Sequence, residues 1–228
     1  MKTAFIIGAS RGLGLGLATE YLGRGWRVIA TERKGRPSGL AALKAAHAGA
    51  LEILPLDIDV PDQIRSAQVA LKGQKIDVLF VNAGVANDPG ETVGEVSTDE
   101  FVRIMTTNAL SPLRAIEAFK DLVPKGGVIA AMSSRLGSVS LNTNGGWEVY
   151  RASKAALNTF MLSFSARHTG EGWTLLVVTP GWVRTDMGGA SGALSIEESI
   201  PGVVDMIEAN TGNPGIRFLD YRNQTVAW

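Results

Sequence analysis

Two side chains suited to proton transfer, Tyr150 and Lys154, stand four positions apart in the run YRASKAALNTFMLSFSA. Apolar residues recur in this run at helical spacing, and residues four apart on a helix share one face. A lysine ammonium favours the phenolate form of a neighbouring tyrosine, so we expect Lys154 to lower the pKa of Tyr150 from its ordinary value of about 10. The pair predicts a general acid or base, although the same spacing also arises by chance in ordinary helices.

A glycine-rich segment, GASRGLGLG, follows the short apolar run TAFII at the start of the chain. Gly8, Gly12 and Gly14 allow a sharp turn from strand to helix and a close approach of the backbone to a pyrophosphate. The helix that begins there would present its free N–H groups to an anion. The pattern predicts a dinucleotide-binding loop, with a plain tight turn as the alternative.

Apolar runs alternate with helical segments along the whole chain. The predicted strands cover residues 3–7, 26–31, 51–58, 76–84, 126–134, 173–180 and 216–221. Continuous apolar runs are typical of strands buried on both faces, and strand–helix alternation is typical of a parallel sheet. We therefore predict an α/β fold with one doubly wound Rossmann domain over residues 1–228. Its sheet should have seven strands, mostly parallel, with helices on both faces.

One predicted helix contains a polar residue of interest. A capping box of Ser97 and Glu100 begins this helix, which we expect to continue to residue 123. Asn108 lies inside it, four residues before Pro112, which removes a backbone hydrogen bond and is expected to kink the helix. Asn108 is either a locally satisfied polar group or a residue that contacts a site.

The polar and glycine-rich features share one position relative to the sheet. They all follow predicted strand ends, at residues 8–14, 32–33, 57, 82–84, 133–134 and 180–185. In an open parallel sheet, ligands bind in the crevice outside the carboxyl ends of the strands. We therefore expect these features to converge on one edge of the sheet.

The charges after the second strand bear on the choice of cofactor. An acid at this point binds the ribose 2′-hydroxyl of NAD, whereas a nearby arginine accommodates the 2′-phosphate of NADP. Glu32 and Arg33 are both present, and Arg11 in the glycine loop adds a second positive charge. Two arginines favour NADP, although Glu32 would repel its phosphate if the carboxylate pointed inward. We predict NADP, with NAD as the alternative.

Composition argues against several other classes of function. The 228 residues include 22 basic and 22 acidic side chains, so no basic field exists to recruit nucleic acid or an acidic membrane. The chain has no cysteine and only two histidines, so a metal site or a Ser-His triad is hard to build. No apolar run reaches the roughly 18 residues of a membrane span, and the N-terminus shows no signal-peptide pattern. We expect a cytoplasmic protein without a metal site.

The motifs together resemble a known family. GASRGLG, NAG at 82–84, Asn108, Ser134, YRASK and PGWVRTDM occur in the order of the classical short-chain dehydrogenase/reductases, over nearly the whole chain. The runs SSRLGSVS and NGGWEVYRASKAALN are most similar to a branch of small carbonyl reductases that includes sniffer-type and C-factor-like proteins. Two features depart from the family pattern. Ile7 replaces the threonine that usually opens the glycine motif, and the interval from Ser134 to Tyr150 is slightly long.

The resemblance implies a role for each matched residue. Tyr150 would exchange a proton with the substrate oxygen, while Lys154 would lower the tyrosine pKa and bind the nicotinamide ribose. Ser134, or its neighbour Ser133, would hydrogen-bond the substrate carbonyl, and Asn108 would hold the helix break and a proton-relay water near Lys154. The implied cofactor contacts are Gly8, Ser10, Arg11, Gly12, Leu13, Gly14, Arg33, Asp57, Ile58, Asn82, Ala83, Gly84, Tyr150, Lys154, Pro180, Gly181, Val183 and Thr185.

The sequence therefore predicts an oxidoreductase of the carbonyl reductase or alcohol dehydrogenase type that acts on a small or medium carbonyl or alcohol. We expect Trp147, Trp182, Met187 and Leu194 to give the pocket an apolar wall, with core packing as the alternative for each tryptophan. The alternative function is that of a dinucleotide-binding signalling or regulatory protein with little turnover. We expect no nucleic-acid or membrane partner, and assembly into a homo-oligomer stays open.

Overall fold

Seven strands form one sheet in the order β3-β2-β1-β4-β5-β6-β7, and every neighbouring pair is parallel. The structure is a computed structural model that describes residues 1–228. The strands are β1 (Thr3–Ile7), β2 (Arg27–Glu32), β3 (Leu51–Pro55), β4 (Val78–Val81), β5 (Val128–Met132), β6 (Thr174–Thr179) and β7 (Gly215–Asp220). The predicted fold class is confirmed, and the sheet is parallel throughout rather than mostly parallel.

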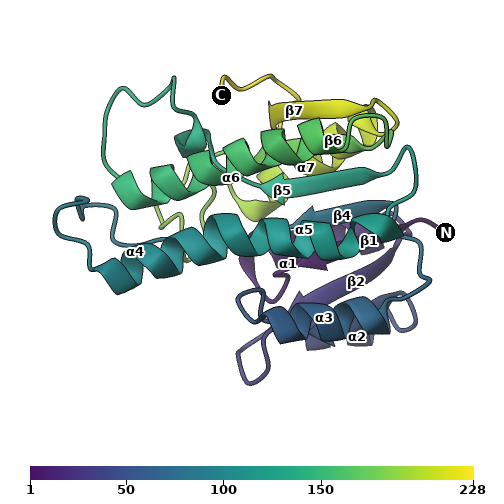
Figure 1. Cartoon of the computed structure of the whole chain (residues 1–228). Helices are drawn as coiled ribbons and strands as arrows, with labels where there is room; N and C mark the ends of the chain where they lie inside the picture. The colour runs from purple at the N-terminus through teal and green to yellow at the C-terminus, as the bar shows by residue number, and fades with distance from the viewer.

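Helices cover both faces of this sheet (Figure 1). They are α1 (Gly12–Gly23), α2 (Leu40–Ala46), α3 (Pro61–Ala70), α4 (Thr98–Met105), α5 (Ser111–Phe119), α6 (Glu148–Arg167) and α7 (Ile196–Asn210). Apolar side chains of α3, α5 and α6 pack against one face, and those of α1, α2 and α7 pack against the other. No helix combines the length and the apolar character needed to cross a membrane.

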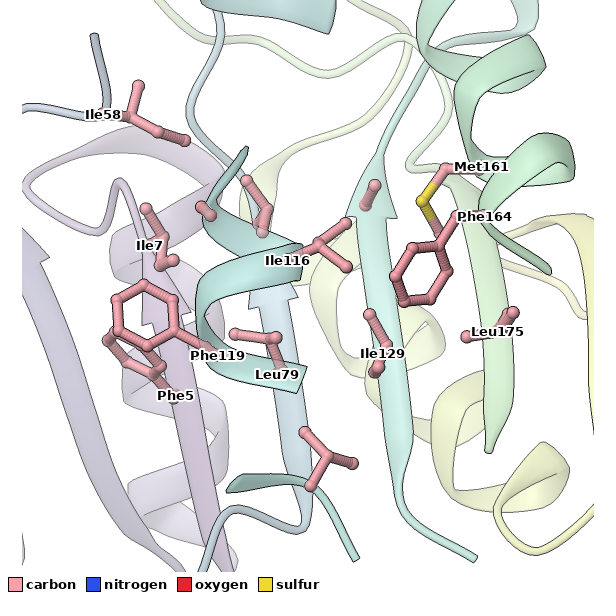
Figure 2. Packing of buried hydrophobic residues seen from close by; sticks show 14 of the residues in the cluster. Phe5, Ile7, Ile58, Leu79, Ile116, Phe119, Ile129, Met161, Phe164 and Leu175 are labelled. Carbon is pink, nitrogen blue, oxygen red and sulfur yellow. The ribbon is translucent and has the colours of Figure 1, made fainter. Parts of the chain in front are cut away.

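Strand β1 shows how one strand serves two cores. All five of its residues are buried. Phe5 and Ile7 belong to the core under α5 and α6, whereas Ala4 and Ile6 belong to the core under α1 and α7, because successive strand residues point to opposite faces. Figure 2 shows Phe5 beside Phe119 of α5, with the two ring centroids 5.0 Å apart and the rings edge to face. Burial on both faces explains the continuous apolar run from which this strand was predicted.

The segment from residue 98 to residue 122 differs from the single kinked helix that we expected. Helix α4 passes into a π-helical turn, η1 (Thr106–Leu110), then into α5, and ends in a 3-10 turn, η2 (Lys120–Leu122). In an α-helix the carbonyl of Asn108 would accept from the N–H of residue 112, and Pro112 has none. A π-helical turn directly before the proline therefore replaces the simple kink.

The helix starts differ from the prediction in one detail. The Ser97 hydroxyl accepts a hydrogen bond from the Glu100 N–H at 3.2 Å, as a capping box requires. The Glu100 carboxylate, however, pairs with Arg103 at 2.7 Å instead of returning to residue 97, so only half of the predicted box forms. A complete capping box begins α7, where Ser195 and Glu198 bond each other's backbone.

Three strands end at least two residues before their predicted ends, and this affects the site. Strand β5 ends at Met132, so Ser133 and Ser134 lie in the loop after it. Strand β3 ends at Pro55 and β4 at Val81. The chain therefore leaves the sheet before Asp57 and before Asn82, and both segments become loops at its carboxyl edge. Helix α2, which has no counterpart among the predicted helices, follows a loop in which the Gly39 N–H donates to the Ser10 carbonyl at 2.9 Å.

Candidate active site

The carboxyl ends of β1, β4, β5 and β6 lie side by side in the sheet, and the chain reverses its direction of strand addition between β1 and β4. The loops after these strands hold the glycine-rich segment, residues 82–84, residues 133–134 and residues 180–185. The expected convergence on one edge is therefore present. Helix α6 crosses the α5 face of this edge and carries Tyr150 and Lys154 in its first two turns.

Tyr150 and Lys154 are both buried, with exposed fractions of 8% and 3%. The Lys154 ammonium donates to the Met132 carbonyl at the end of β5 at 2.9 Å, and its Nζ lies 5.7 Å from the centroid of the Tyr150 ring. Burial penalises the charged form of each group. It lowers the pKa of Lys154 to about 8 and raises the pKa of Tyr150 to about 12.

The expectation that the Tyr150 pKa falls below its ordinary value is therefore wrong for this arrangement of side chains. The Tyr150 pKa rises because burial outweighs the other influences, and the group that lowers it is the Ser134 hydroxyl, through a side-chain hydrogen bond. Four-residue spacing correctly places the two side chains together, but it does not show how completely the folded chain shields them from solvent. At neutral pH the phenol keeps its proton, which is the form that can donate.

The two serines after β5 have separate tasks. The buried Ser133 hydroxyl donates to Asn158 Oδ1 on α6 at 2.7 Å, so it is already engaged in the core. The Ser134 hydroxyl accepts from the Leu136 N–H at 3.1 Å and lies beside the Tyr150 phenol. Of the two alternatives, the structure places Ser134 at the site and Ser133 behind it.

Asn108 is fully buried in the π-helical turn and joins three segments. Its Oδ1 accepts from the Val85 N–H at 2.8 Å, and its Nδ2 donates to the Val85 carbonyl at 2.8 Å. The same Nδ2 donates to Ser153 Oγ at 2.9 Å, and that hydroxyl donates to the Tyr150 carbonyl at 2.7 Å. Asn108 therefore fixes the loop after β4 against the helix that carries Tyr150.

Sequence reasoning missed two supporting residues of this cluster, Ser153 and Asn158. Asn158 receives the Ser133 hydroxyl and donates from Nδ2 to the Gly137 carbonyl at 3.1 Å. It thereby ties α6 to the 3-10 turn η3 (Arg135–Gly137) that follows Ser134. The only signal in the sequence was spacing, since Asn158 is four residues after Lys154 on the same face of the helix.

The glycine loop forms a cradle that admits no side chains at two positions. Gly8 has a φ of +86°, and a Cβ added there would lie 2.8 Å from the Ala83 Cα. A Cβ added at Gly14 would lie 2.1 Å from the Gly8 carbonyl oxygen. The Asn82 amide donates to that same carbonyl at 2.8 Å, which fixes the loop to the end of β4.

A hydroxyl braces this turn even though Ile7 replaces the usual threonine. It belongs to Thr31 on β2, and it accepts a hydrogen bond from the Gly8 N–H at 2.9 Å. Ile7 instead packs in the core on the α5 face of the sheet (Figure 2). The departure from the family motif is therefore compensated by the neighbouring strand.

The start of α1 faces the loop after β6 across a hollow of about 470 Å³. Its lining includes Arg11, Gly12, Arg184, Thr185 and Asp186. Arg11 Nη1 pairs with Asp186 Oδ2 at 2.5 Å, and both side chains are exposed. The closely approaching backbone, the helix N-terminus and the two arginines fit the pyrophosphate of a dinucleotide.

The remaining predicted cofactor residues lie around the same edge. Arg33 is exposed after β2, and Ile58 is buried in the loop after β3. The Pro180 carbonyl accepts the Ser199 hydroxyl at 2.6 Å, and Thr185 Oγ1 accepts the Gly188 N–H at 3.0 Å. Ser10, Leu13, Asp57, Ala83, Gly84, Gly181 and Val183 belong to these same loops and to the start of α1.

Two of the residues expected to line the pocket differ in their contacts. Trp147 is half-buried directly before α6, and its ring centroid lies 5.6 Å from that of Tyr150. It has a φ of +54°, in a run of left-handed residues with Gly145 and Gly146, and its N–H donates to the Pro89 carbonyl at 3.1 Å. Trp182 is 57% exposed, and its indole N–H donates to the Gly188 carbonyl at 2.8 Å.

Comparison with known proteins agrees with this geometry. The sequence pattern of the short chain dehydrogenase family matches residues 2–193. The C-signal protein of Myxococcus xanthus is 38% identical over 155 residues, which cover 67% of this chain and 93% of that protein.

Two solved structures show the same fold. A protein from Burkholderia multivorans with bound NADP is 51% identical, with a TM-score of 0.98 and coverage of 100% of this chain and 99% of that one. The carbonyl reductase Sniffer of D. melanogaster is 31% identical, with a TM-score of 0.88 and full coverage of both chains. The resemblance seen in the sequence is confirmed, and the chain belongs to the short-chain dehydrogenase/reductase family of oxidoreductases.

Proposed function

We propose that the protein is an NADP-preferring carbonyl reductase or alcohol dehydrogenase in which Tyr150 is the acid and base. The observation that carries the proposal is the buried Tyr150 phenol, which has the Ser134 hydroxyl on one side and the Lys154 ammonium near its ring. A positioned hydroxyl donor and a proton donor are what a carbonyl oxygen needs as it gains negative charge. Residues 1–228 would act as one dinucleotide-binding and catalytic unit.

The cofactor would be held by the glycine cradle, the start of α1 and the loop after β6. A nicotinamide cofactor supplies or accepts the hydride when it is bound there. Gly8 and Gly14 let the backbone approach the pyrophosphate, and Thr185 lies on the opposite wall of the hollow. The NADP found in the Burkholderia multivorans relative supports this assignment.

NADP preference is proposed from the charges at the end of β2. Arg33 is exposed there without an ion-pair partner, and Arg11 is exposed at the start of the hollow. Glu32, directly before Arg33, is half-buried and also makes no ion pair within 4.0 Å. A phosphate monoester gains charge-assisted hydrogen bonds from arginines, so we expect Arg33, with Arg11 once it leaves Asp186, to outweigh Glu32.

The chain's own residues would handle the proton. In reduction, Ser134 would hydrogen-bond the carbonyl oxygen, and Tyr150 would transfer its phenolic proton to that oxygen. The raised Tyr150 pKa, about 12, keeps this proton available at neutral pH. The Lys154 ammonium would stabilise the phenolate that remains, because a nearby opposite charge favours the ionised form. Asn108 and Ser153 would keep the Tyr150 backbone in place.

The proposed substrate is a small or medium carbonyl compound, or the corresponding alcohol, with apolar character. The half-buried Trp147 beside Tyr150 and the exposed Trp182 and Met187 in the loop after β6 offer apolar surface near the site. A marked preference for charged substrates would contradict this part of the proposal.

The experiment is an assay of the purified protein with NADPH and with NADH against a panel of ketones, aldehydes and quinones. We expect oxidation of NADPH with apolar carbonyls, and a lower KM for NADPH than for NADH. Arg33→Ala should weaken NADPH binding about tenfold while leaving NADH binding nearly unchanged, since it removes one charge-assisted contact. A folded protein that oxidises neither cofactor with any substrate would overturn the proposal.

A second candidate function is favoured by the similarity to C-signal, which is 38% identical over two thirds of this chain. On this alternative the protein binds a dinucleotide for a signalling or regulatory task with little turnover. Tyr150→Phe distinguishes the two, because it removes the proton donor and leaves the cofactor loop unchanged. If a cellular phenotype of the gene's loss is rescued by Tyr150→Phe, turnover is not the function.

A further inference from the structure

A carboxylate outside the assigned site accepts hydrogen bonds from hydroxyls in the π-helical turn and directly after it. Asp59, in the loop after β3, accepts the Thr107 hydroxyl on Oδ2 at 2.6 Å. Its other oxygen, Oδ1, accepts the Ser111 hydroxyl at 2.7 Å. Both hydroxyl-bearing residues are buried, with exposed fractions of 7% and 0%. O–H to carboxylate bonds of this length belong to the strong, charge-assisted class.

The two hydroxyls flank Asn108 on either side of the turn. Thr107 precedes it directly, and Ser111 begins α5 immediately before Pro112. The proline cannot donate to the Asn108 carbonyl, so this part of the helix lacks one of its ordinary internal bonds. Asp59 therefore supplies an external support at the point where the helix is weakest.

The same residue also reaches the region proposed to hold the cofactor. The Asp59 N–H donates to Asp57 Oδ1 at 3.1 Å, and Asp57 and Ile58 are proposed cofactor contacts. Asp59 thus joins the loop after β3 to the turn that carries Asn108. From Asn108 the bonds continue through Ser153 to the Tyr150 carbonyl.

We propose that Asp59 is a positioning residue for the proposed reaction. Its carboxylate sets the π-helical turn, so that Asn108 holds Val85 and, through Ser153, the first turn of α6 with Tyr150. Asp59 touches neither the phenol nor the reacting atoms, and it acts only through Thr107 and Ser111. The expected effect of Asp59 on kcat rests on the proposed hydride-transfer function. Its expected effect on the structure of the π-helical turn does not depend on that function.

The kinetic test compares Asp59→Ala and Asp59→Asn with the wild-type protein. Asp59→Ala should lower kcat about tenfold or more, because small displacements of a catalytic group are costly, with KM for the carbonyl changed by less than about threefold. Asp59→Asn keeps one acceptor oxygen and should recover part of the loss. Asp62→Asn is the matched control, because it removes a charge from an aspartate that is exposed, as Asp59 is, but pairs only with Arg65 and does not bond the π-helical turn.

Thr107 and Ser111, the two residues that donate to Asp59, give an independent check of its proposed role. Thr107→Val and Ser111→Ala each remove one hydroxyl, and each should lower kcat by less than Asp59→Ala. In the double variant Asp59→Ala/Thr107→Val, the second change should add almost nothing, because the bond is already lost. Full additivity of the two changes would overturn the proposal.

Hydrogen exchange measures the turn without any turnover. Amides of residues 106–111 and of Val85 should exchange faster in Asp59→Ala than in the wild type or in Asp62→Asn. Unchanged exchange at these amides would overturn the proposal. A fall in both KM and kcat in Asp59→Ala that is equally large in Asp59→Asn would overturn it as well. If the wild-type protein showed no hydride transfer at all, faster exchange in Asp59→Ala would still support the role in the turn. That result would place the failure with the proposed function instead.

Discussion

The glycine loop after β1 makes room for its proposed ligand by lacking side chains, whereas the site on α6 depends on side chains held in place by hydrogen bonds. At Gly14, an added methyl group would lie 2.1 Å from a carbonyl oxygen. Around Tyr150, by contrast, Asn108, Ser153 and Asn158 bond backbone and hydroxyl groups from three different segments. The first region should therefore fail when an atom is added, and the second when a polar atom is removed.

The largest expected effect tests the second region. Tyr150→Phe removes one oxygen and should lower kcat/KM about 10²–10⁴-fold, the usual contribution of a general acid. The affinity for NADPH, measured by fluorescence titration, should change by less than about twofold, because only the Tyr150 hydroxyl is lost among the implied cofactor contacts and the glycine loop and Lys154 are untouched. Loss of cofactor affinity in this variant would show that the two regions are not separate.

The next effect tests the first region. Gly14→Ala should lower the free energy of unfolding by about 1–3 kcal/mol, as overpacking does, and should weaken NADPH binding. Gly23→Ala, at the end of the same helix, is the control, because nothing lies within 4 Å of the added Cβ. It should be neutral or stabilise the protein by up to about 1 kcal/mol. Equal effects of the two substitutions on NADPH binding would show that Gly14 is no more important for the cofactor than a glycine at the far end of α1.

Because Lys154 is buried, the free energy of unfolding is expected to depend on pH. Burial lowers the Lys154 pKa from 10.5 to about 8, so between these values the unfolded chain binds more protons than the folded one. Stability contributed by this group therefore rises with pH, by about 2 kcal/mol from about pH 7.5 to about pH 9.5. Lys154→Met should abolish that rise, as measured by urea unfolding at the two pH values. The range stays below the ordinary tyrosine pKa, so that Tyr150 does not contribute.

A parallel pH curve for Lys154→Met and the wild type would contradict this expectation. It would mean that water reaches the Lys154 ammonium in the folded protein. In that case the region around Tyr150 would be no better shielded from water than the glycine loop.

The smallest effect concerns the hydroxyl that braces the glycine loop from β2. Thr31→Val keeps the shape of the side chain but leaves the Gly8 N–H without its acceptor, and it should cost about 1 kcal/mol of stability. Thr19→Val on α1 is the control, because its hydroxyl is exposed and bonds only a helix carbonyl, so its effect should stay within about 0.5 kcal/mol. An equal fall in melting temperature in both variants would show that the Thr31–Gly8 hydrogen bond contributes no more to stability than the Thr19 hydroxyl.

The sequence was sufficient to predict the sheet and the glycine loop because both are encoded locally. A run such as that of β1, buried on both faces, has to be apolar throughout, and Gly14 is required by the Gly8 carbonyl only six residues before it. The parallel direction of the strands followed from the alternation of strands and helices. The family resemblance, confirmed over residues 2–193, rests on the same local motifs.

The support of the proposed catalytic region around Tyr150 could not be predicted, because its bonds join residues far apart in the chain. Asp59 meets Thr107 and Ser111, and Ser133 meets Asn158, through contacts that only the folded sheet creates. The direction of the Tyr150 pKa shift was predicted wrongly for the same reason. Burial outweighs the Ser134 hydrogen bond, and the burial of a side chain at a helix start depends on what the rest of the chain places over it.

The left-handed backbone of Trp147 has a consequence for protein engineering. An aromatic residue in this conformation costs roughly 1 kcal/mol relative to glycine, and here the contacts with Pro89 and the Tyr150 ring oppose that cost. Replacement by glycine would relax the backbone and at the same time remove one wall beside the proposed proton donor. Thermostability and substrate selectivity are therefore set against each other at this one position, and a library built to improve either property should vary the residue with the other property under selection.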